Sequence, residues 1–349
     1  IRDRLRLNGF LKKIVKMSFN EVIDRYAYTP LEELFDEFGL SEYPRELLTE
    51  GFAAGYQTLD DPSKNSAADF ILCMKIFERG IRKYKTPLFS SVGGFGKIAE
   101  SLAKVIEENG GKVLLGSRVN EILVRNGKVY GVKVNSKSIE SKKVLFAAPV
   151  YDLIELVDEA YMDLDWARKA MDCRKNATKL FLIIGGIKRA IREHPTGTWI
   201  MIPRSETKDV DTYYIVYEVS SELRQAPEGK FLLTISAMPS RKELRNRIKL
   251  LKGMENDFNG VFPEIDFEND FEWRTSVYFP IVDGAARTVD LYWKRRLGPE
   301  TPVEGLYVCG DTTLELSSGV DGCASSAILA YEKISGEKVI NLEKFFSLK

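Results

Sequence analysis

A glycine-bearing stretch near the C-terminus carries the residues best suited to ligand chemistry. Apolar residues at 306–308 predict a short buried strand, and Gly310 and Asp311 follow it. Gly310 permits a sharp turn or a close approach of the backbone to another group. Asp311 then stands at the carboxyl end of a strand, which is the edge where open α/β sheets bind ligands. We therefore expect this carboxylate to accept hydrogen bonds from a ligand.

The same stretch continues into a helix that begins among small residues. Gly319 and Gly322 flank Val320 at the expected helix start. The free N–H groups and the positive dipole end of a helix N-terminus attract anions. Taken alone, residues 305–326 also fit an ordinary strand, loop and helix in which Asp311 is a capping residue.

The composition excludes several other classes of function. Lys and Arg number 51, as do Asp and Glu, so no net charge points to nucleic acid or to another highly charged partner. The four cysteines are widely spaced, which predicts reduced core thiols rather than disulfides or zinc ligands. The single histidine, His194, precedes a proline in an expected surface turn. We therefore predict neither a histidine-based catalytic triad nor a metal site.

Length and hydropathy set the organisation of the chain. The 349 residues suffice for two domains, or for one domain with an insertion. No apolar run approaches the roughly 18 residues of a membrane span, and no signal peptide is visible. A cytoplasmic protein is the resulting expectation. The chain begins with Ile1 rather than Met, which is typical of a fragment or a processed chain.

Hydrophobic periodicity predicts the elements that must position these residues. The expected elements are helices within 1–85, a helix over 97–109, strands over 112–118, 119–125, 128–134 and 143–149, a helix over 152–170, strands over 179–185, 198–202, 213–219 and 231–237, a helix over 241–258, and a terminal helix from 322. Asn126 and Gly127 give the strongest hairpin signal. The basic run at 294–296 is expected to be a solvated face.

In their order, these motifs resemble the FAD-dependent amine oxidase and phytoene desaturase superfamily. The matching features are Gly93 and Gly94 before a helix, the hairpin at 126–127, the strand that ends in Ala147, Ala148 and Pro149, and the stretch 305–326. The resemblance covers residues 17–335. It implies an α/β fold with an α+β insert, in which a discontinuous FAD-binding domain of the glutathione-reductase type is interrupted by a substrate domain of mixed sheet and helices.

The resemblance also assigns segments and site residues. It places the helical part of the substrate domain at 1–90, FAD-domain segments at 91–150 and 297–349, and the mixed-sheet part of the substrate domain at 151–296. FAD is the implied cofactor, and the implied cofactor-binding residues are Val119, Ala147, Ala148, Pro149, Gly310, Asp311, Gly319, Val320 and Gly322. Trp273, Tyr278 and Phe279 are expected to line the substrate cavity. No carboxylate or lysine stands out as a catalytic acid or base.

The implied function is an FAD-dependent oxidoreductase in which the flavin accepts a hydride from a small organic substrate. Both an amine-oxidase-like and a dehydrogenase or desaturase reaction fit, and an apolar isoprenoid substrate would suit peripheral membrane contact. The strand and G-x-G-x-x-G with which the family opens are not found before residue 91. If the 349 residues are the whole molecule, the adenosine half of the cofactor site is largely unbuilt and FAD binding is expected to be weak or lost; if a further segment precedes Ile1, the site is expected to be complete. The sequence leaves the oligomeric state open.

Two alternatives come from other classes of function. One is a non-catalytic binding protein on the same scaffold, like the Rab GDP-dissociation inhibitors, and the missing fingerprint favours it. The other is an NAD(P)-binding enzyme that uses residues 94–99, where Gly94, Gly96 and Ala99 match the letters of a dinucleotide fingerprint. The weak strand before this pattern argues against the second alternative.

Overall fold

The computed structural model describes residues 2–57, 59, 61–86, 89–191, 197 and 199–347. The chain forms two compact units. Unit 1 comprises Ile1–Pro87, Leu115–Thr178 and Asp283–Lys349, and unit 2 comprises Leu88–Leu114 and Lys179–Val282. The boundaries of these units do not show which segment holds a cofactor. The assignment of the four segments to an FAD-binding domain and a substrate domain therefore stays a prediction.

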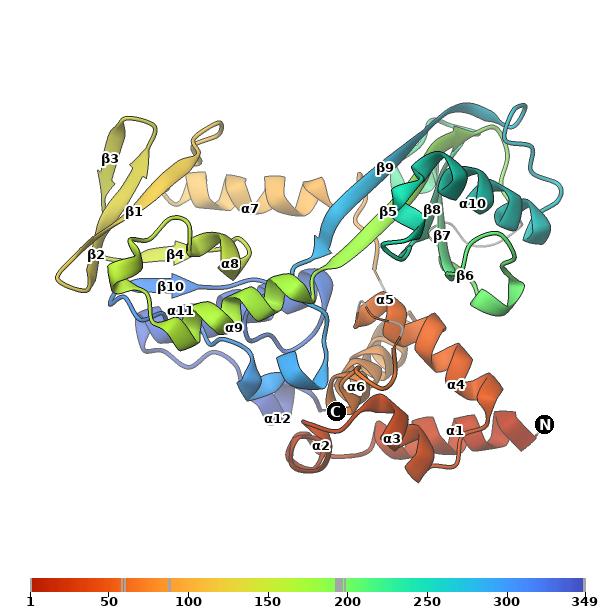
Figure 1. The fold of residues 1–349 in the computed structure, drawn as a ribbon, viewed down its shortest axis with the longest axis horizontal. Helices are drawn as coiled ribbons and strands as arrows, with labels where there is room; N and C mark the ends of the chain where they lie inside the picture. The colour runs from red at the N-terminus through yellow and green to blue at the C-terminus, as the bar shows by residue number, and fades with distance from the viewer. Residues whose placement is uncertain are drawn as a thin grey trace. The chain divides into compact units, whose positions relative to one another are not determined.

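The first part of unit 1 is helical, as the sequence predicts (Figure 1). Its elements are α1 (Arg2–Ile14), α2 (Phe19–Tyr26), α3 (Leu31–Glu37), α4 (Glu42–Leu48), the π-helix η1 (Thr49–Ala53), α5 (Ala54–Tyr56) and α6 (Ala67–Tyr84). Ser18 caps α2, because its side chain accepts a hydrogen bond from the Glu21 N–H at 3.1 Å. The apolar faces of these helices pack with Tyr292, Leu316 and Phe346, so the helical core includes residues from the C-terminal segment.

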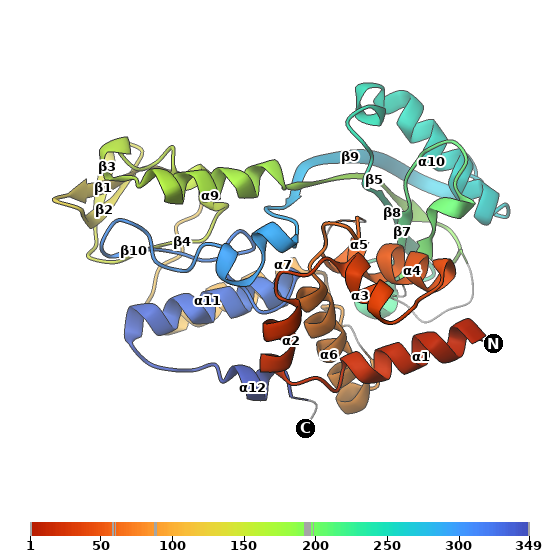
Figure 2. The ribbon, with the colours of Figure 1, turned by 60° about the horizontal axis from the view of Figure 1, so that its bottom comes forward.

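The rest of unit 1 contains two small sheets. Its elements are β1 (Val119–Arg125), β2 (Lys128–Val134), β3 (Lys137–Glu140), β4 (Val144–Phe146), α8 (Val150–Leu153), η2 (Glu159–Tyr161), α9 (Leu164–Lys175), η6 (Val289–Leu291), η7 (Trp293–Arg295), β10 (Leu306–Val308), α11 (Gly319–Ser335) and α12 (Leu342–Phe345). Strands β1, β2 and β3 form one antiparallel sheet, and β4 pairs in parallel with β10. Figure 2 shows α9 and α11 on opposite sides of the β4–β10 pair.

Unit 2 is built on a five-stranded sheet of order β6-β7-β8-β5-β9. Its elements are α7 (Gly96–Glu108), β5 (Thr178–Ile187), β6 (Trp199–Ile202), η3 (Arg204–Glu206), β7 (Tyr214–Ser220), η4 (Ser221–Leu223), β8 (Phe231–Ala237), η5 (Glu243–Arg245), α10 (Arg247–Val261) and β9 (Phe271–Asp283). Apolar residues of the sheet pack against α10 through Leu250, Met254 and Phe258. The buried Asp257 carboxylate accepts hydrogen bonds from the Lys208, Asp209 and Val210 N–H groups and from the Tyr214 hydroxyl.

Several sequence predictions hold in the structure. The hairpin turn has Asn126 at φ +53° and Gly127 at φ +73°, both left-handed, as a two-residue turn between twisted strands requires. The four strands expected between 179 and 237 form β5 to β8. None of the helices in the described part of the chain is long and apolar enough to cross a lipid bilayer.

Other predictions were wrong in detail. Residues 112–118 form no strand, because none of the described strands pairs with them. The helix expected over 152–170 is broken into shorter pieces, since Asp158 caps η2 and Asp163 caps α9. Helix α10 begins at Arg247 rather than 241, where the Asn246 side chain caps it. The sheet of unit 2 was expected to be mixed, but its β6/β7, β7/β8 and β5/β8 ladders are all antiparallel.

Candidate functional site

The two parallel strands of unit 1 end at the same edge, and predicted site residues follow both of them. Ala147, Ala148 and Pro149 come directly after β4, while Gly310 and Asp311 come after β10. The Cys309 N–H donates to the Phe146 carbonyl at 3.0 Å, which extends the pairing to the strand ends. The structure therefore brings these two groups of predicted residues together at the edge of the sheet where ligands bind in α/β folds.

The Asp311 side chain has one oxygen engaged and one available. Its Oδ2 accepts a hydrogen bond from the Gly284 N–H at 2.7 Å. Gly284 has no room for a side chain, because a Cβ there would overlap the Thr312 methyl group and lie 3.0 Å from Asp311 Oδ1. Among the described residues, no donor is bonded to Oδ1, and Asp311 is half-buried. A fixed carboxylate with a free oxygen is suited to accepting a hydrogen bond from a ligand hydroxyl.

Hydroxyl side chains hold the turn that follows Asp311. The Thr312 hydroxyl accepts from the Val150 N–H at 3.0 Å, which ties the turn to the residue after Pro149. Thr313 and Ser326 share a hydrogen bond between their hydroxyls at 2.6 Å, and Ser326 also accepts from the Gly310 N–H at 3.1 Å. These buried bonds fix the turn against α11 and against the end of β4.

The start of α11 divides into an open face and a filled face. Ser318 occupies the N-cap position without a side-chain cap, and no acceptor among the described residues is bonded to the Val320 or Asp321 N–H. Gly319 has φ +59°, and the Val320 side chain is 50% exposed. These N–H groups are available to an anion or to the polar edge of a ligand.

Gly322 lies on the filled face of α11. A Cβ there would overlap Glu315 Oε2 and lie 2.7 Å from the Ser317 carbonyl oxygen. Gly322 is buried, so in this structure its missing side chain makes room for the Glu315 carboxylate. The packing of Glu315 therefore explains why a glycine stands at position 322, which the sequence alone does not show.

Val119 and the β4 segment contribute differently to the site. Val119 is the first residue of β1 and pairs with Val134, so it belongs to the antiparallel sheet rather than to the β4–β10 pair. Ala147 and Ala148 are exposed, and Pro149 is half-buried at the N-cap of α8. The roles of these residues toward a cofactor remain predictions.

A buried ion cluster lies behind the Asp311 turn, and the sequence did not suggest it. The Arg287 and Arg296 guanidiniums both pair with Glu315 Oε1, Arg287 at 2.8 Å. All three side chains are at least 96% buried. The expectation that residues 294–296 form a solvated face was therefore wrong for Arg296, because Glu315 and several backbone carbonyls satisfy its charge inside the protein.

Asp69 on α6 interacts electrostatically with the same cluster. Burial raises the pKa of Asp69 from 3.8 to about 6, although Arg287, Arg296 and a hydrogen bond from Gln57 act in the opposite direction. At a pH between 3.8 and about 6, Asp69 is therefore protonated in the folded state and ionised in the unfolded state. The stability conferred by this proton is therefore greatest in acid and falls as the pH rises towards 6.

The Asp69→Asn substitution is expected to remove this pH dependence. We expect the free energy of unfolding of the wild type to fall, relative to the Asn variant, by about 2 kcal/mol from about pH 4.5 to about pH 7.5. Urea unfolding at the two pH values measures this difference. Glu78→Gln, on the exposed side of the same helix, is the control that should leave the wild-type difference unchanged. A wild-type difference retained in Asp69→Asn would contradict the assignment.

The three predicted substrate residues all lie on β9 in unit 2. Trp273 is 53% exposed, and its indole lies over Gly186 of β5, where a Cβ would be 2.6 Å from the indole nitrogen. Phe279 is 41% exposed. Tyr278 instead packs against the core of unit 2, and the Arg247 guanidinium stands 4.4 Å from its ring centre. Of the three, Trp273 and Phe279 thus expose a large part of their apolar surface to solvent, whereas Tyr278 does not.

The remaining sequence candidates have structural explanations or lie outside the described residues. Residues 89–95 form no strand before α7, so the pattern at 94–99 lacks the strand that a dinucleotide fingerprint requires. The prediction of core thiols is confirmed for Cys73, Cys173 and Cys309, which are buried, but Cys323 is exposed. His194 lies outside the residues that the structure describes.

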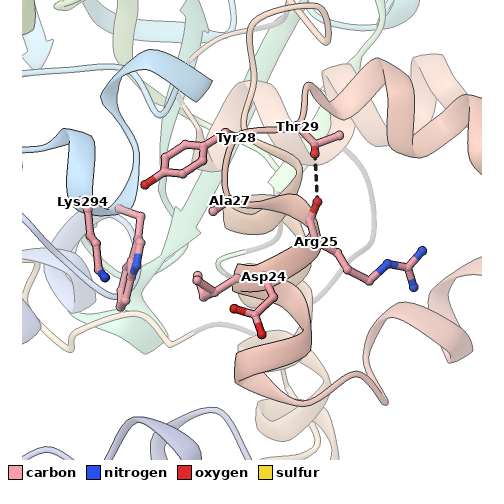
Figure 3. Close-up of a pocket in the computed structure, with 8 residues that line it drawn as sticks. Asp24, Arg25, Ala27, Tyr28, Thr29 and Lys294 are labelled. Carbon is pink, nitrogen blue, oxygen red and sulfur yellow. Dashed lines mark hydrogen bonds between the residues drawn. The ribbon is translucent and has the colours of Figure 1, made fainter.

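A separate pocket of about 350 Å³ opens on the helical part of unit 1 (Figure 3). It is lined by Ile23, Asp24, Arg25, Ala27, Tyr28, Thr29, Trp293 and Lys294. The Arg25 side chain points away from Lys294, and the Thr29 hydroxyl donates to the Arg25 carbonyl at 3.1 Å. None of the residues predicted to bind cofactor or substrate lines this pocket.

Comparisons with known proteins bear on the whole chain. The family model for "Flavin containing amine oxidoreductase" matches residues 3–334. Rab GDP dissociation inhibitor beta of Canis lupus familiaris is 23% identical over 245 residues, which cover 67% of this chain and 49% of that protein. An oxidoreductase from Methanosarcina mazei has a TM-score of 0.74 at 19% identity, over 95% of this chain and 73% of that chain. A double mutant of putrescine oxidase has a TM-score of 0.62 at 10% identity, over 96% of this chain and 76% of that chain.

These findings fix the fold and the family. At such low identity the two solved structures show the fold alone, and they confirm the predicted α/β class. The chain spans about half the length of the inhibitor that it matches. Because the family model matches nearly the whole chain, the chain belongs to the family of flavin-containing amine oxidoreductases, and its cofactor is FAD.

Proposed function

We propose that this protein is an FAD-dependent oxidoreductase whose residues 310–322 hold the ribityl chain and the flavin ring. The observation that carries this proposal is the Asp311 carboxylate, which is fixed through Oδ2 and open at Oδ1. When bound, FAD supplies the two-electron acceptor for the oxidation of an organic substrate. The residues of the chain bind and orient this cofactor.

Two groups of donors and acceptors perform the binding. Asp311 Oδ1 would accept a hydrogen bond from a ribityl hydroxyl, because no other described donor occupies it. The uncapped N–H groups in the first turn of α11 would donate to the polar edge of the flavin ring. There the helix dipole would also stabilise the negative charge that develops on the ring during reduction. Neither group requires a catalytic acid or base from the protein.

The substrate is proposed to be a small molecule with a large apolar part. Trp273 and Phe279 on β9 expose aromatic surface, and Ile281 and Val282 at the end of the same strand are also exposed. Exposed apolar side chains of this kind are suited to contact with an apolar ligand or a membrane. A desaturase-like reaction on an isoprenoid, with peripheral membrane contact, fits this surface better than the oxidation of a small polar amine.

A second candidate is a non-catalytic binding protein, and the similarity to a Rab GDP dissociation inhibitor favours it. The two candidates differ in whether the protein holds flavin. A binding protein of this kind has no need for the open Asp311 oxygen or for the uncapped start of α11.

Flavin uptake separates the two candidates. We expect the purified intact protein either to be yellow or to take up added FAD, with visible flavin absorbance that remains after gel filtration. Bound FAD should also raise the unfolding temperature, because a ligand that binds only the folded state stabilises it. A colourless protein that neither retains FAD nor gains stability from it would exclude the enzyme and leave the binding protein.

A further inference from the structure

The Arg296 guanidinium joins several backbone segments behind the Asp311 turn. Its Nη1 donates to the Asp311 carbonyl at 2.6 Å, its Nη2 to the Ala285 carbonyl at 2.8 Å, and its Nε to the Leu291 carbonyl at 2.7 Å. The side chain is 2% exposed. An arginine suits this place because its planar fork presents five N–H donors in fixed directions.

Two contacts therefore hold Asp311 to the same neighbouring segment. Arg296 connects the Asp311 carbonyl to Ala285, and the Gly284 N–H holds the Asp311 carboxylate at Oδ2. With both the backbone and one carboxylate oxygen fixed, the direction of Oδ1 is determined. The Arg296 contact is therefore a means of orienting the oxygen that faces the ligand.

Arg287 belongs to the same ion cluster but holds a different part of unit 1. Its Nη2 pairs with Glu315 Oε1 at 2.8 Å, as Arg296 also does. Its Nη1 donates to the Tyr56 carbonyl at 3.1 Å, in the helical segment, and its side chain is 1% exposed. Arg287 thus matches Arg296 in burial, charge and carboxylate partner, but its Nη1 bonds to the helical segment, whereas the Nη1 of Arg296 bonds to the Asp311 carbonyl.

We propose that Arg296 is a positioning residue for the flavin, which sets the orientation of the Asp311 carboxylate through the backbone of the 310–313 turn. This inference rests on the proposed function. It assigns Arg296 a role beyond the general stability that both buried arginines provide. The comparison of Arg296 with Arg287 therefore separates positioning from stability.

The test compares Arg296→Lys with Arg287→Lys in the intact protein. Each lysine keeps the charge and loses the fork, so both variants should unfold at lower temperature than the wild type. Arg296→Lys should weaken FAD binding about 10- to 100-fold in a fluorescence titration, as the loss of charge-assisted bonds predicts. Arg287→Lys should change it by less than about threefold. Equal losses in the two variants, or no loss in Arg296→Lys, would overturn the proposal.

A second measurement needs no cofactor. Hydrogen exchange of the Gly310 and Thr313 amides, which bond to Ser326 and to the Gly310 carbonyl, reports the order of the turn directly. We expect exchange there to be about 10-fold faster in Arg296→Lys and unchanged in Arg287→Lys. Equal exchange rates in the two variants would refute the positioning role of Arg296, whether or not the wild type binds FAD. A wild type that binds no FAD would refute only the proposed function. Arg296→Gln, which keeps an N–H donor, replaces Arg296→Lys if that variant does not fold.

Discussion

Replacing Gly322 with alanine is expected to lower the free energy of unfolding by about 3 kcal/mol, at the upper end of the usual cost of overpacking a filled site. The added Cβ would overlap Glu315 Oε2 and would press on the Ser317 carbonyl at 2.7 Å. Glu315 has little freedom to move, because its other oxygen binds two buried guanidiniums. Moving the carboxylate would disturb the pairing of both arginines, and unpaired buried charges are costly.

Gly319→Ala is the matched control for this experiment. It lies three residues earlier on α11, and nothing stands within 4 Å of a Cβ at that position. Its φ of +59° gives alanine a backbone strain of about 1 kcal/mol and no steric clash. In urea unfolding, the free energy of unfolding of Gly322→Ala should therefore be well below that of Gly319→Ala. Equal stability of the two would show that Glu315 does not fill the space beside Gly322.

Local rules account for the parts of the fold that the sequence predicted well. The Asn126–Gly127 turn follows from the left-handed conformations that these residues tolerate, and helix α7 follows from its apolar spacing. Asp158 and Asp163 are of a residue type that favours helix starts, and each caps a separate helix within the range 152–170, where a single helix was expected. These features depend only on neighbours in the sequence.

The ion cluster could not be predicted in the same way. Arg287, Arg296 and Glu315 are separated by 9 and 19 residues, and each alone resembles an exposed charge. Their pairing depends on how the segments at 284–296 and 311–318 meet, which is a tertiary property. For the same reason the sequence could not show that the missing side chain of Gly322 makes room for Glu315; its role toward a cofactor stays a prediction.

The structure brings some of the predicted site residues together and places others apart. Asp311 and the residues after β4 come together because parallel strands end at one edge, which the strand assignments already implied. Val119 lies in another sheet, and the exposure of Trp273 and Phe279 differs from that of Tyr278. Strand periodicity did not separate these aromatic residues, since burial on β9 depends on its partners in the sheet.

Asp311→Asn is expected to weaken FAD binding about 10- to 100-fold while leaving the fold intact. The asparagine amide oxygen can take the place of Oδ2 and accept the Gly284 N–H. Its NH₂ group then stands where Oδ1 was, so an acceptor facing the ribityl hydroxyls becomes a donor. The substitution therefore changes the chemistry presented to the ligand more than the stability of the turn.

The FAD affinity of Asp311→Asn tests the central claim most directly, measured by fluorescence titration beside the wild type and Asp165→Asn. Asp165 is a 78% exposed carboxylate on α9, so its loss of charge is the matched control. Circular dichroism and thermal unfolding verify that all three proteins are folded. If residues 310–322 hold the flavin, Asp311→Asn binds FAD about 10- to 100-fold more weakly and Asp165→Asn binds it like the wild type. A folded Asp311→Asn protein with wild-type affinity would contradict the account.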